Sequence, residues 1–288
     1  MISRYFAYNK KVSIIYVDNT KLLDDIMKLK KMPESFSELI GKFYTACGMM
    51  AFSDIKEESD ELITQVNGGG ESGILYSSSK LKDGILNIKG FVENKNIDFS
   101  KYNNIADIIG KNGNITIIKN NIYTRLGYKG ITPLISGNIL DDFRNYYENS
   151  TQKPAFLGIE VFKQENLIRC IGYLITFMPD ATDKEILNIK NNLDKKILLE
   201  NLIKANKNND EIVKEITADS NIEKLEDSDI IYKCDCNKEK YVEMFYTLKK
   251  NELEEILGNE EKINIVCQYC NKSYDFSREE IENIIKDL

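Results

Sequence analysis

The chain contains no histidine, and this absence excludes several common classes of active site. Without an imidazole base, neither a Ser-His-Asp triad nor a Cys-His pair can form. The sequence also carries no recognisable nucleophile elbow and no Walker motif. We therefore expect that the protein is not an enzyme, and any zinc site must be built from thiolates or carboxylates.

Long apolar runs are absent as well. No stretch approaches the roughly 18 residues that a membrane-spanning helix needs, and Met1–Tyr5 does not begin a signal peptide. The formal net charge of −7 argues against a general affinity for nucleic acid or acidic membranes. We expect a cytoplasmic protein with no nucleic-acid or membrane partner. Thiols stay reduced in that compartment, so clustered cysteines indicate metal or redox chemistry rather than structural disulfides.

The first 179 residues mix strand and helix signals. Short segments rich in aromatic and β-branched residues are separated by Gly or Asn, a pattern typical of antiparallel strands. A capping box at Ser35 and Glu38 predicts the start of an apolar helix through Met50. Further elements are expected at a strand pair within Tyr5–Tyr16, strands Leu62–Val66, Gly73–Ser78, Ile85–Val92 and Ile115–Ile118, a helix over Ile139–Tyr147, and a hairpin of Leu157–Phe162 with Leu167–Phe177. We predict an α+β core domain over residues 1–179, with substantial antiparallel sheet.

Residues 180–231 differ in composition from the core. The stretch 183–229 contains neither Pro nor Gly and is dense in Lys, Glu, Asp and Asn. Thr182 and Glu185 form a second capping box. Apolar residues then recur at helical spacing, at Ile186, Ile189, Leu193 and Ile197, and again at Ile212, Val213, Ile216, Ile222 and Leu225. The segment is predicted to be amphipathic and helical, either as an ordinary helical hairpin packed on the core or as a functional linker.

The last unit, residues 232–288, is so small that we expect it to need a metal or disulfides to stay folded. Four of the six cysteines lie here, as a C-x-C pair and a C-x-x-C pair: Cys234, Cys236, Cys267 and Cys270. A C-x-C pair in extended backbone can aim both sulfurs at one ion, and a C-x-x-C pair wraps a tight turn around it. Four thiolates are the tetrahedral set of a structural zinc site, so we predict one zinc ion held by these cysteines. A helical stretch is expected between the pairs, and a third capping box at Ser277 and Glu280 predicts a closing helix.

The zinc could have either of two roles. Closed four-thiolate sites are most often structural, and such a site leaves the metal no open position for a substrate. A redox role follows from the pairing, because oxidants attack thiolates and each cysteine has a near neighbour that can trap a sulfenic acid as a disulfide. A domain this small would unfold without its metal, and a segment that leans on it would then uncover apolar surface. Cys47 and Cys170 lie in apolar stretches and are interpreted as buried, inert thiols.

The C-terminal cysteine segments resemble the 33 kDa redox-regulated chaperonin family, heat shock protein 33. In Cys234–Tyr241 the family usually has Ser at the position of Asn237 and Arg at that of Lys240, while Glu239 fits its pattern. Val266–Cys270 also matches, with Tyr269 where Phe is common, and is followed by the matching Tyr274 and Phe276.

The resemblance extends through the core. Three segments carry it: Gly68, Gly70 and Gly73 with Glu71 where the family tends to have Pro, Lys89–Val92, and Ser150–Pro154 followed by Leu157 and Gly158, with Thr151 replacing Glu. The glycines lack the Gly-Lys-Ser/Thr ending and the helix of a phosphate loop, so we interpret them as a turn and expect no nucleotide.

The resemblance implies a stress-response chaperone in three parts: a client-binding and dimerisation domain over 1–179, a linker folded over it at 180–231, and a redox switch over 232–288. It implies that the reduced, zinc-bound form is inactive or weakly active. Oxidation would pair Cys234 with Cys236 and Cys267 with Cys270, release zinc and unfold the linker. The oxidised form would hold unfolded or oxidatively damaged proteins without ATP and would commonly dimerise.

Two other functions stay open from the sequence. One is a constitutive zinc ribbon that binds nucleic acid or a protein partner. Ribbons more often use two C-x-x-C pairs, however, and Asn237–Val266 carries more Glu than Lys. The other is a member of the resembled family whose zinc is only structural.

Overall fold

The computed structural model describes residues 1–121, 124–152, 154–195, 198–258 and 260–288. Its chain forms two compact units, Met1–Tyr232 and Lys233–Leu288. Lys153 of the expected Ser150–Pro154 segment and Ile197 of the expected apolar stripe lie outside the described residues.

The first sheet of the large unit contains, within the described residues, five antiparallel strands in the order β10-β1-β2-β9-β8. Its two hairpins, β1–β2 and β8–β9, pair through the two inner strands. The bounds are β1 Ile2–Ala7, β2 Val12–Asp18, β8 Ala155–Gln164, β9 Leu167–Phe177 and β10 Glu223–Ser228.

The second sheet has six strands within the same described residues, in the order β11-β5-β4-β3-β6-β7. All of its pairs are antiparallel except β11 with β5, which is parallel. The bounds are β3 Asp60–Asn67, β4 Leu75–Lys82, β5 Ile85–Val92, β6 Asn114–Asn121, β7 Thr124–Pro133 and β11 Ile230–Tyr232.

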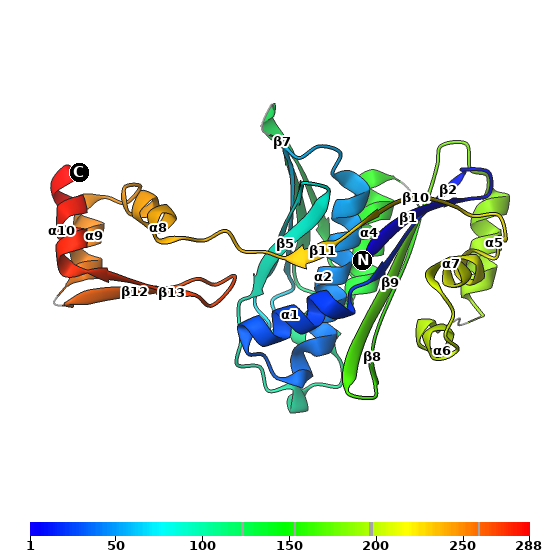
Figure 1. Cartoon of the computed structure of the whole chain (residues 1–288), viewed down its shortest axis with the longest axis horizontal. Helices are drawn as coiled ribbons and strands as arrows, with labels where there is room; N and C mark the ends of the chain where they lie inside the picture. Colours follow the sequence, from blue (N-terminus) through cyan, green and yellow to red (C-terminus); the bar gives the residue numbers. More distant parts are fainter. Residues whose placement is uncertain (122–123, 153, 196–197, 259) are drawn as a thin grey trace. The chain divides into compact units, whose positions relative to one another are not determined.

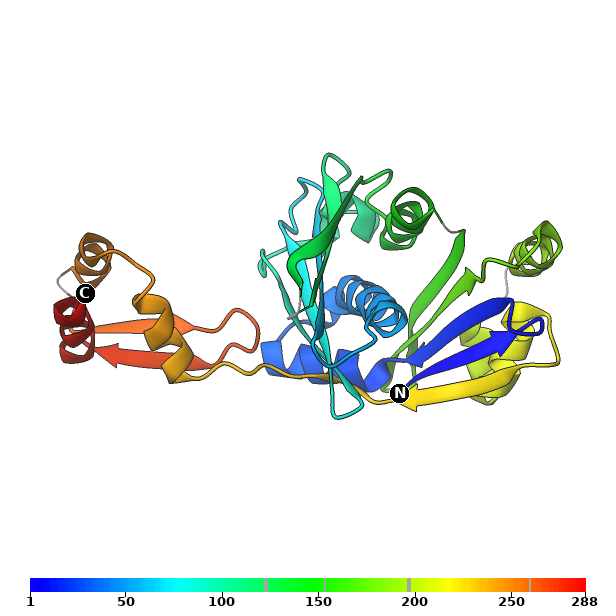
Figure 2. The ribbon, with the colours of Figure 1, turned by 90° about the horizontal axis from the view of Figure 1, so that it is seen from above.

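Helix α2 (Ser37–Asp54) lies between the two sheets, as Figure 2 shows, and contacts strands of both. Most of its residues are buried, which explains its apolar sequence: a helix packed on two sides must be apolar nearly all round. The other helical elements beside these sheets are α1 Thr20–Lys30, α3 Ile105–Ile109, α4 Ile139–Tyr146, the 3₁₀ turns Glu34–Phe36 and Phe99–Lys101, and a π-helical turn Tyr147–Thr151.

Three short helices, α5 (Asp183–Leu193), α6 (Leu199–Lys204) and α7 (Asn209–Thr217), cover the other face of the five-stranded sheet. They lie on the opposite side of that sheet from α2 (Figure 1). Their apolar side chains form a second hydrophobic cluster with strand residues of β1, β2 and β9.

The small unit is built from α8 (Lys238–Phe245), α9 (Lys250–Leu257), the hairpin of β12 (Lys262–Val266) and β13 (Ser273–Ser277), and α10 (Arg278–Asp287). Its core consists of side chains such as Phe245, Leu253, Phe276 and Ile281, to which Cys267 also belongs. The single helical stretch expected between the cysteine pairs is thus two helices followed by a strand.

The α+β class with antiparallel sheets and helices is confirmed, and so are the capping boxes at Thr182 and Ser277. The box at Ser35 is wrong. Ser35 lies inside a 3₁₀ turn, and the α-helix starts at Ser37 with no side-chain cap. An N-cap residue needs extended backbone, which a residue within a turn does not have. Gly68–Gly73 is the expected turn, between β3 and β4.

The helical pattern expected through Ile222 and Leu225 is wrong for residues 223–232, which are the strands β10 and β11. The free edges of β1 and β5 offer unpaired backbone groups, and pairing with them outweighs a weak helical periodicity. Leu225 is 42% exposed on this edge strand. The segment predicted as a helical linker is therefore helical only up to Thr217.

Candidate metal centre

The first cysteine pair lies on irregular backbone immediately before α8. Asn237 caps that helix, since its side-chain oxygen accepts a hydrogen bond from the Lys240 backbone N–H at 2.9 Å. The helix therefore starts at Lys238, two residues after Cys236. Lys240 Nζ in turn donates to the Asp235 carbonyl oxygen at 2.8 Å, which ties the residue between the two cysteines back to the first turn of the helix.

The second pair lies in the turn between β12 and β13. The Cys267 N–H donates to the Lys272 carbonyl at 2.9 Å, and the Asn271 N–H donates to the Cys267 carbonyl at 2.8 Å. Asn271 has a φ of 60°, in the left-handed region that Asn tolerates well. These bonds fold the chain back within a few residues, so that both sulfurs of the pair face one side.

The four cysteines that the sequence singled out meet in space: their Sγ atoms all lie within 4.8 Å of one another. Cys234 Sγ is 3.7 Å from Cys267 Sγ, and Cys236 Sγ is 3.3 Å from Cys270 Sγ. Sulfurs bound tetrahedrally to zinc at about 2.3 Å would be about 3.8 Å apart. All four cysteines are free. The donor set and its dimensions therefore fit a tetrahedral thiolate metal.

Two tyrosine hydroxyls also reach the sulfurs. Tyr274 of β13 lies with its hydroxyl 2.8 Å from the Cys236 carbonyl oxygen and 3.2 Å from Cys236 Sγ, so its one hydrogen is shared between the two acceptors. The Tyr241 hydroxyl, from α8, hydrogen-bonds Cys267. The two rings pack with centroids 5.1 Å apart. Sequence reasoning missed both contacts: Tyr241 and Tyr274 were noted only as parts of the family pattern.

The protonation of the thiols reflects burial and hydrogen bonding. Burial raises the pKa of Cys234 and of Cys270. Burial also acts to raise the pKa of Cys267, but donors from Tyr241 and from the backbone of Cys270 and Tyr269 outweigh it and lower that pKa to about 6. One thiolate is therefore favoured at neutral pH even without a cation, and a bound cation would favour the others.

The remaining cysteines behave differently. Cys47 and Cys170 are both buried in the large unit, as predicted. Burial raises the pKa of each to about 12. Cys170 Sγ lies 3.1 Å from Thr45 Oγ1, in an apolar setting next to α2. Neutral thiols in such surroundings are inert.

Comparisons with known proteins place this arrangement. A model of the family described as Hsp33 protein matches residues 1–277. The 33 kDa chaperonin of Clostridioides difficile is 27% identical over 292 residues, covering 100% of this chain and 99% of that protein. The 33 kDa chaperonin of Clostridium acetobutylicum is 30% identical over 290 residues, covering 98% and 96% respectively.

A solved structure of another 33 kDa chaperonin is similar to this chain. The crystal structure of the 33 kDa chaperonin (heat shock protein 33 homolog) of Thermotoga maritima aligns with a TM-score of 0.83 and covers 99% of this chain and 98% of that chain. At 21% sequence identity this similarity establishes the fold. None of the helices in the described residues has the length and apolar character that crossing a bilayer requires.

Proposed function

The chain belongs to the Hsp33 family of chaperonins, and on that premise we propose that it is a redox-regulated, ATP-independent holdase. This is a chaperone family and not an enzyme family, and its members bind unfolded proteins. The proposal for this chain rests above all on the cluster of Cys234, Cys236, Cys267 and Cys270 in the small unit.

We assign zinc to this cluster, because four thiolates in a closed tetrahedral set are typical of zinc sites. Bound zinc would hold all four sulfurs as thiolates and supply about 10–16 kcal/mol of folding free energy to a domain of this size. Cys267 belongs to the small unit's hydrophobic cluster, and the other three sulfurs pack against it. Loss of the metal would therefore remove support from the centre of the unit.

Oxidation is proposed to close the disulfides Cys234–Cys236 and Cys267–Cys270. All four sulfurs lie within 4.8 Å of one another, with 3.7 Å between those of Cys234 and Cys267 and 3.3 Å between those of Cys236 and Cys270. A disulfide holds its two sulfurs about 2.05 Å apart, so closing one draws a pair of sulfurs out of the tetrahedral arrangement. This rearrangement couples the oxidation to loss of the four-thiolate geometry, so the metal and the disulfides exclude one another.

The three helices α5–α7 supply the element that oxidation would release. Ile189, Leu199, Ile212, Val213 and Ile216 are fully buried against the five-stranded sheet. Beneath them lie apolar side chains of three strands: Tyr5, Ala7, Val12, Ile14, Tyr16, Ile171, Ile175 and Phe177. A sheet face of this composition is suited to holding apolar segments of unfolded proteins. We propose that it is the client surface.

Polar contacts fasten the same helices to the sheet. The Tyr5 hydroxyl donates to Asp210 at 2.9 Å, and the Tyr8 N–H donates to Asp219 at 2.6 Å. The Glu160 carboxylate accepts from the backbone N–H groups of Leu199 and Glu200, each at 2.8 Å. These helices are short and make few contacts with one another, so they depend on the sheet for stability.

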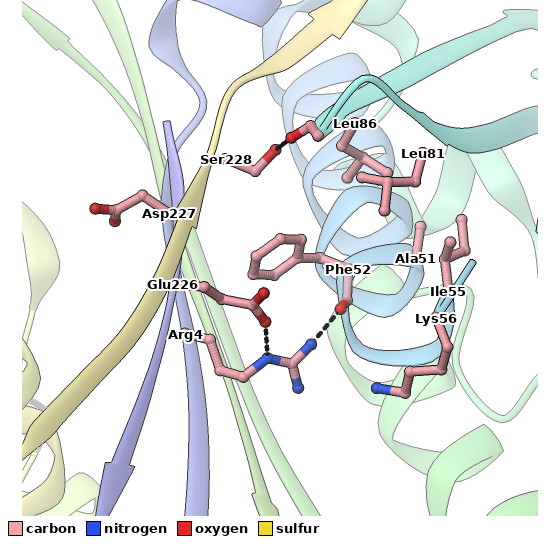
Figure 3. Close-up of a pocket in the computed structure, with 11 residues that line it drawn as sticks. Arg4, Ala51, Phe52, Ile55, Lys56, Leu81, Leu86, Glu226, Asp227 and Ser228 are labelled. Atoms are coloured by element: carbon pink, nitrogen blue, oxygen red, sulfur yellow. Dashed lines mark hydrogen bonds and ion pairs between the residues drawn. The ribbon is translucent and has the colours of Figure 1, made fainter. Parts of the chain in front are cut away.

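The strand β10 adds a further contact, shown in Figure 3. Arg4 of β1 pairs with Glu226 of β10 at 2.6 Å and also donates to the Phe52 carbonyl near the end of α2. The contact borders a cavity of about 470 Å³ between β10 and that helix end. Arg4 thereby ties β10, a strand of the proposed linker, to the central helix of the core.

We assign residues 1–179 to client binding and dimerisation, 180–231 to the linker and 232–288 to the switch. The boundary between the compact units, after Tyr232, supports the second division. We further propose that the protein acts in the cytoplasm, dimerises on activation and binds no nucleic acid. The acidic excess of Asn237–Val266 supports the last point.

One parallel measurement tests the proposal: zinc content, free thiols and aggregation of an unfolding client, before and after peroxide treatment at elevated temperature. We expect zinc loss, two disulfides and suppressed aggregation to appear together. A Cys47→Ala, Cys170→Ala double variant, which keeps the cluster, should respond as the wild type does. Zinc loss without suppressed aggregation would refute the proposed holdase function. Retention of zinc through oxidation would show that the metal is only structural.

A further inference from the structure

Two tyrosine hydroxyls lie against the sulfur cluster and take no part in the proposed disulfide formation. Tyr274 is buried, and its hydroxyl oxygen lies 3.2 Å from Cys236 Sγ. Tyr241 packs against the hydrophobic cluster that contains Cys267, its ring centroid lies 5.1 Å from that of Tyr274, and its hydroxyl bonds Cys267. One tyrosine comes from β13 and the other from α8. Each cysteine pair therefore has one sulfur that accepts a hydrogen bond from a phenol.

We propose that these hydroxyls select which sulfur of each pair a peroxide attacks: Cys234 and Cys270 react first, while Cys236 and Cys267 are held back. The inference rests on the proposed redox switch and concerns its zinc-loaded form, in which all four sulfurs are thiolates whatever the pKa of each free thiol. A hydrogen bond draws electron density from a thiolate, which makes that sulfur both a poorer nucleophile and a poorer electron donor to a metal. Tyr241 and Tyr274 are thus positioning residues that act through the sulfurs.

The C-x-C pair isolates the effect of the hydroxyl. Cys234 and Cys236 are both partly buried, so access alone does not distinguish them. What differs is the phenol, since Tyr274 reaches Cys236. In the C-x-x-C pair two factors act in the same direction, because Cys267 is only 1% exposed and also accepts the bond from Tyr241. Cys270 is partly exposed by comparison.

The division of roles gives a balanced reaction with a hydroperoxide as oxidant. The thiolate of Cys234 or Cys270 attacks one peroxide oxygen; an S–O bond forms, the O–O bond breaks, and hydroxide leaves and is protonated to water. The thiolate of Cys236 or Cys267 then attacks the sulfenic sulfur of its neighbour, forming the disulfide and expelling a second hydroxide. Each pair of sulfurs loses two electrons, and the peroxide gains them.

The test uses the reduced, zinc-loaded full chain and the variants Tyr274→Phe and Tyr241→Phe. Tyr246→Phe is the matched control, because that hydroxyl bonds the Asp287 carboxylate at 3.2 Å and touches no sulfur. Zinc release is timed once with hydrogen peroxide and once with a chelator alone. We expect peroxide-driven release to accelerate about tenfold in each of the first two variants. Release to the chelator should be equal or slower, since the freed sulfur binds the metal more strongly.

These two rates separate an electronic role from a structural one. A variant that merely loosens the unit would release zinc faster under both conditions, and that result overturns the inference. So does a peroxide rate equal to that of the wild type and of Tyr246→Phe. If the wild type loses zinc to peroxide and the variants lose it at the same rate, the inference is refuted but the proposed switch is not. A wild type that keeps its zinc throughout refutes the proposed switch and the inference together.

Mapping the first oxidised sulfur in the wild type gives an answer that needs no variant to fold. A dimedone-type trap is added with substoichiometric peroxide, and the labelled cysteine is located by mass spectrometry. Label is expected on Cys234 or Cys270. Label appearing first on Cys236 or Cys267 overturns the inference.

Discussion

The two compact units are stabilised in different ways. The large unit packs α2 between two sheets and buries a continuous set of apolar side chains around it, from Ile2 to Ile230. The small unit has a far smaller cluster, and Cys267 is part of it while three other cysteines pack on its surface. Apolar burial suffices to fold a unit of the first size, whereas one of the second size usually needs a metal or disulfides.

The cysteines follow the same division. In the large unit Cys47 and Cys170 lie in the hydrophobic core, and burial raises the pKa of each to about 12. In the small unit the sulfurs gather within reach of one ion. The proposed redox chemistry is therefore concentrated in the unit whose stability depends on its sulfurs. On that proposal, oxidation would unfold this unit while the proposed client surface in the other stays folded.

The largest effect should come from removing a sulfur of the cluster. Cys267→Ser should abolish zinc binding and unfold the small unit, since about 10–16 kcal/mol of metal-coupled folding free energy is lost. Hydrogen exchange should show full loss of protection in β12, β13 and α10, while β3, β4 and β5 stay protected. Cys47→Ala serves as the control and should keep its zinc. Protected amides in a zinc-free small unit would show that this unit, like the large one, folds without a metal.

A second prediction activates the protein without oxidation. Ile216→Asp places a carboxylate in the cluster between α7 and the sheet, where Ile216 is fully buried. It should weaken docking of the helices by about 3–5 kcal/mol. Client aggregation should then be suppressed under reducing conditions with zinc still bound.

The matched control for that change is Leu187→Asp. Leu187 lies on α5 and is 53% exposed, so the same substitution there buries no charge. It should leave the reduced protein inactive. Equal activity in the two variants would show that docking of these helices does not mask the client surface.

The sequence predicted the elements whose signal is local. Helix α2 is apolar on nearly all sides, and the β8–β9 hairpin has two apolar strands. The spacing of the four cysteines predicts a shared metal site. Helix α1 was missed because its Lys-rich surface hides a narrow buried face at Leu22, Leu23 and Ile26. Strand β7 was missed as well. Strands β10 and β11 follow from partners far along the chain, which no local pattern contains.

The site shows the same limit. Residue spacing predicted that the four sulfurs meet, but it could not reveal their mutual distances or the side chains that surround them. The hydroxyl of Tyr274 reaches Cys236 only because β13 pairs with β12 and returns along the cluster. Tyr241 and Tyr274 also read as ordinary core aromatics, since half of each side chain is apolar.

A third prediction concerns alkaline pH and the buried thiols. The pKa of Cys47 and of Cys170 is raised from 9.0 to about 12 in the folded protein. Their contribution to stability is therefore full below pH 9 and is lost as pH rises toward 12. At pH 10 each thiol should lower the folding equilibrium constant of the large unit about tenfold. Denaturant titrations at several pH values should show this slope reduced in Cys47→Ala, Cys170→Ala. An unchanged slope would contradict the role of these thiols.

The smallest effect is expected at Glu160, where the large unit's own strand holds a linker helix. Its carboxylate accepts from the N–H groups of Leu199 and Glu200, which begin α6. Glu160→Gln removes the charge that favours a helix N-terminus and should weaken α6 by about 1 kcal/mol. Faster exchange of those two amides would report it, with exposed Glu165→Gln of the β8–β9 turn as control. Because α6 is one of three docked helices, the amount of oxidant needed for activation should fall only slightly. If Glu160→Gln is instead as active without oxidant as Ile216→Asp, this single contact, rather than the apolar face, holds the linker on the sheet.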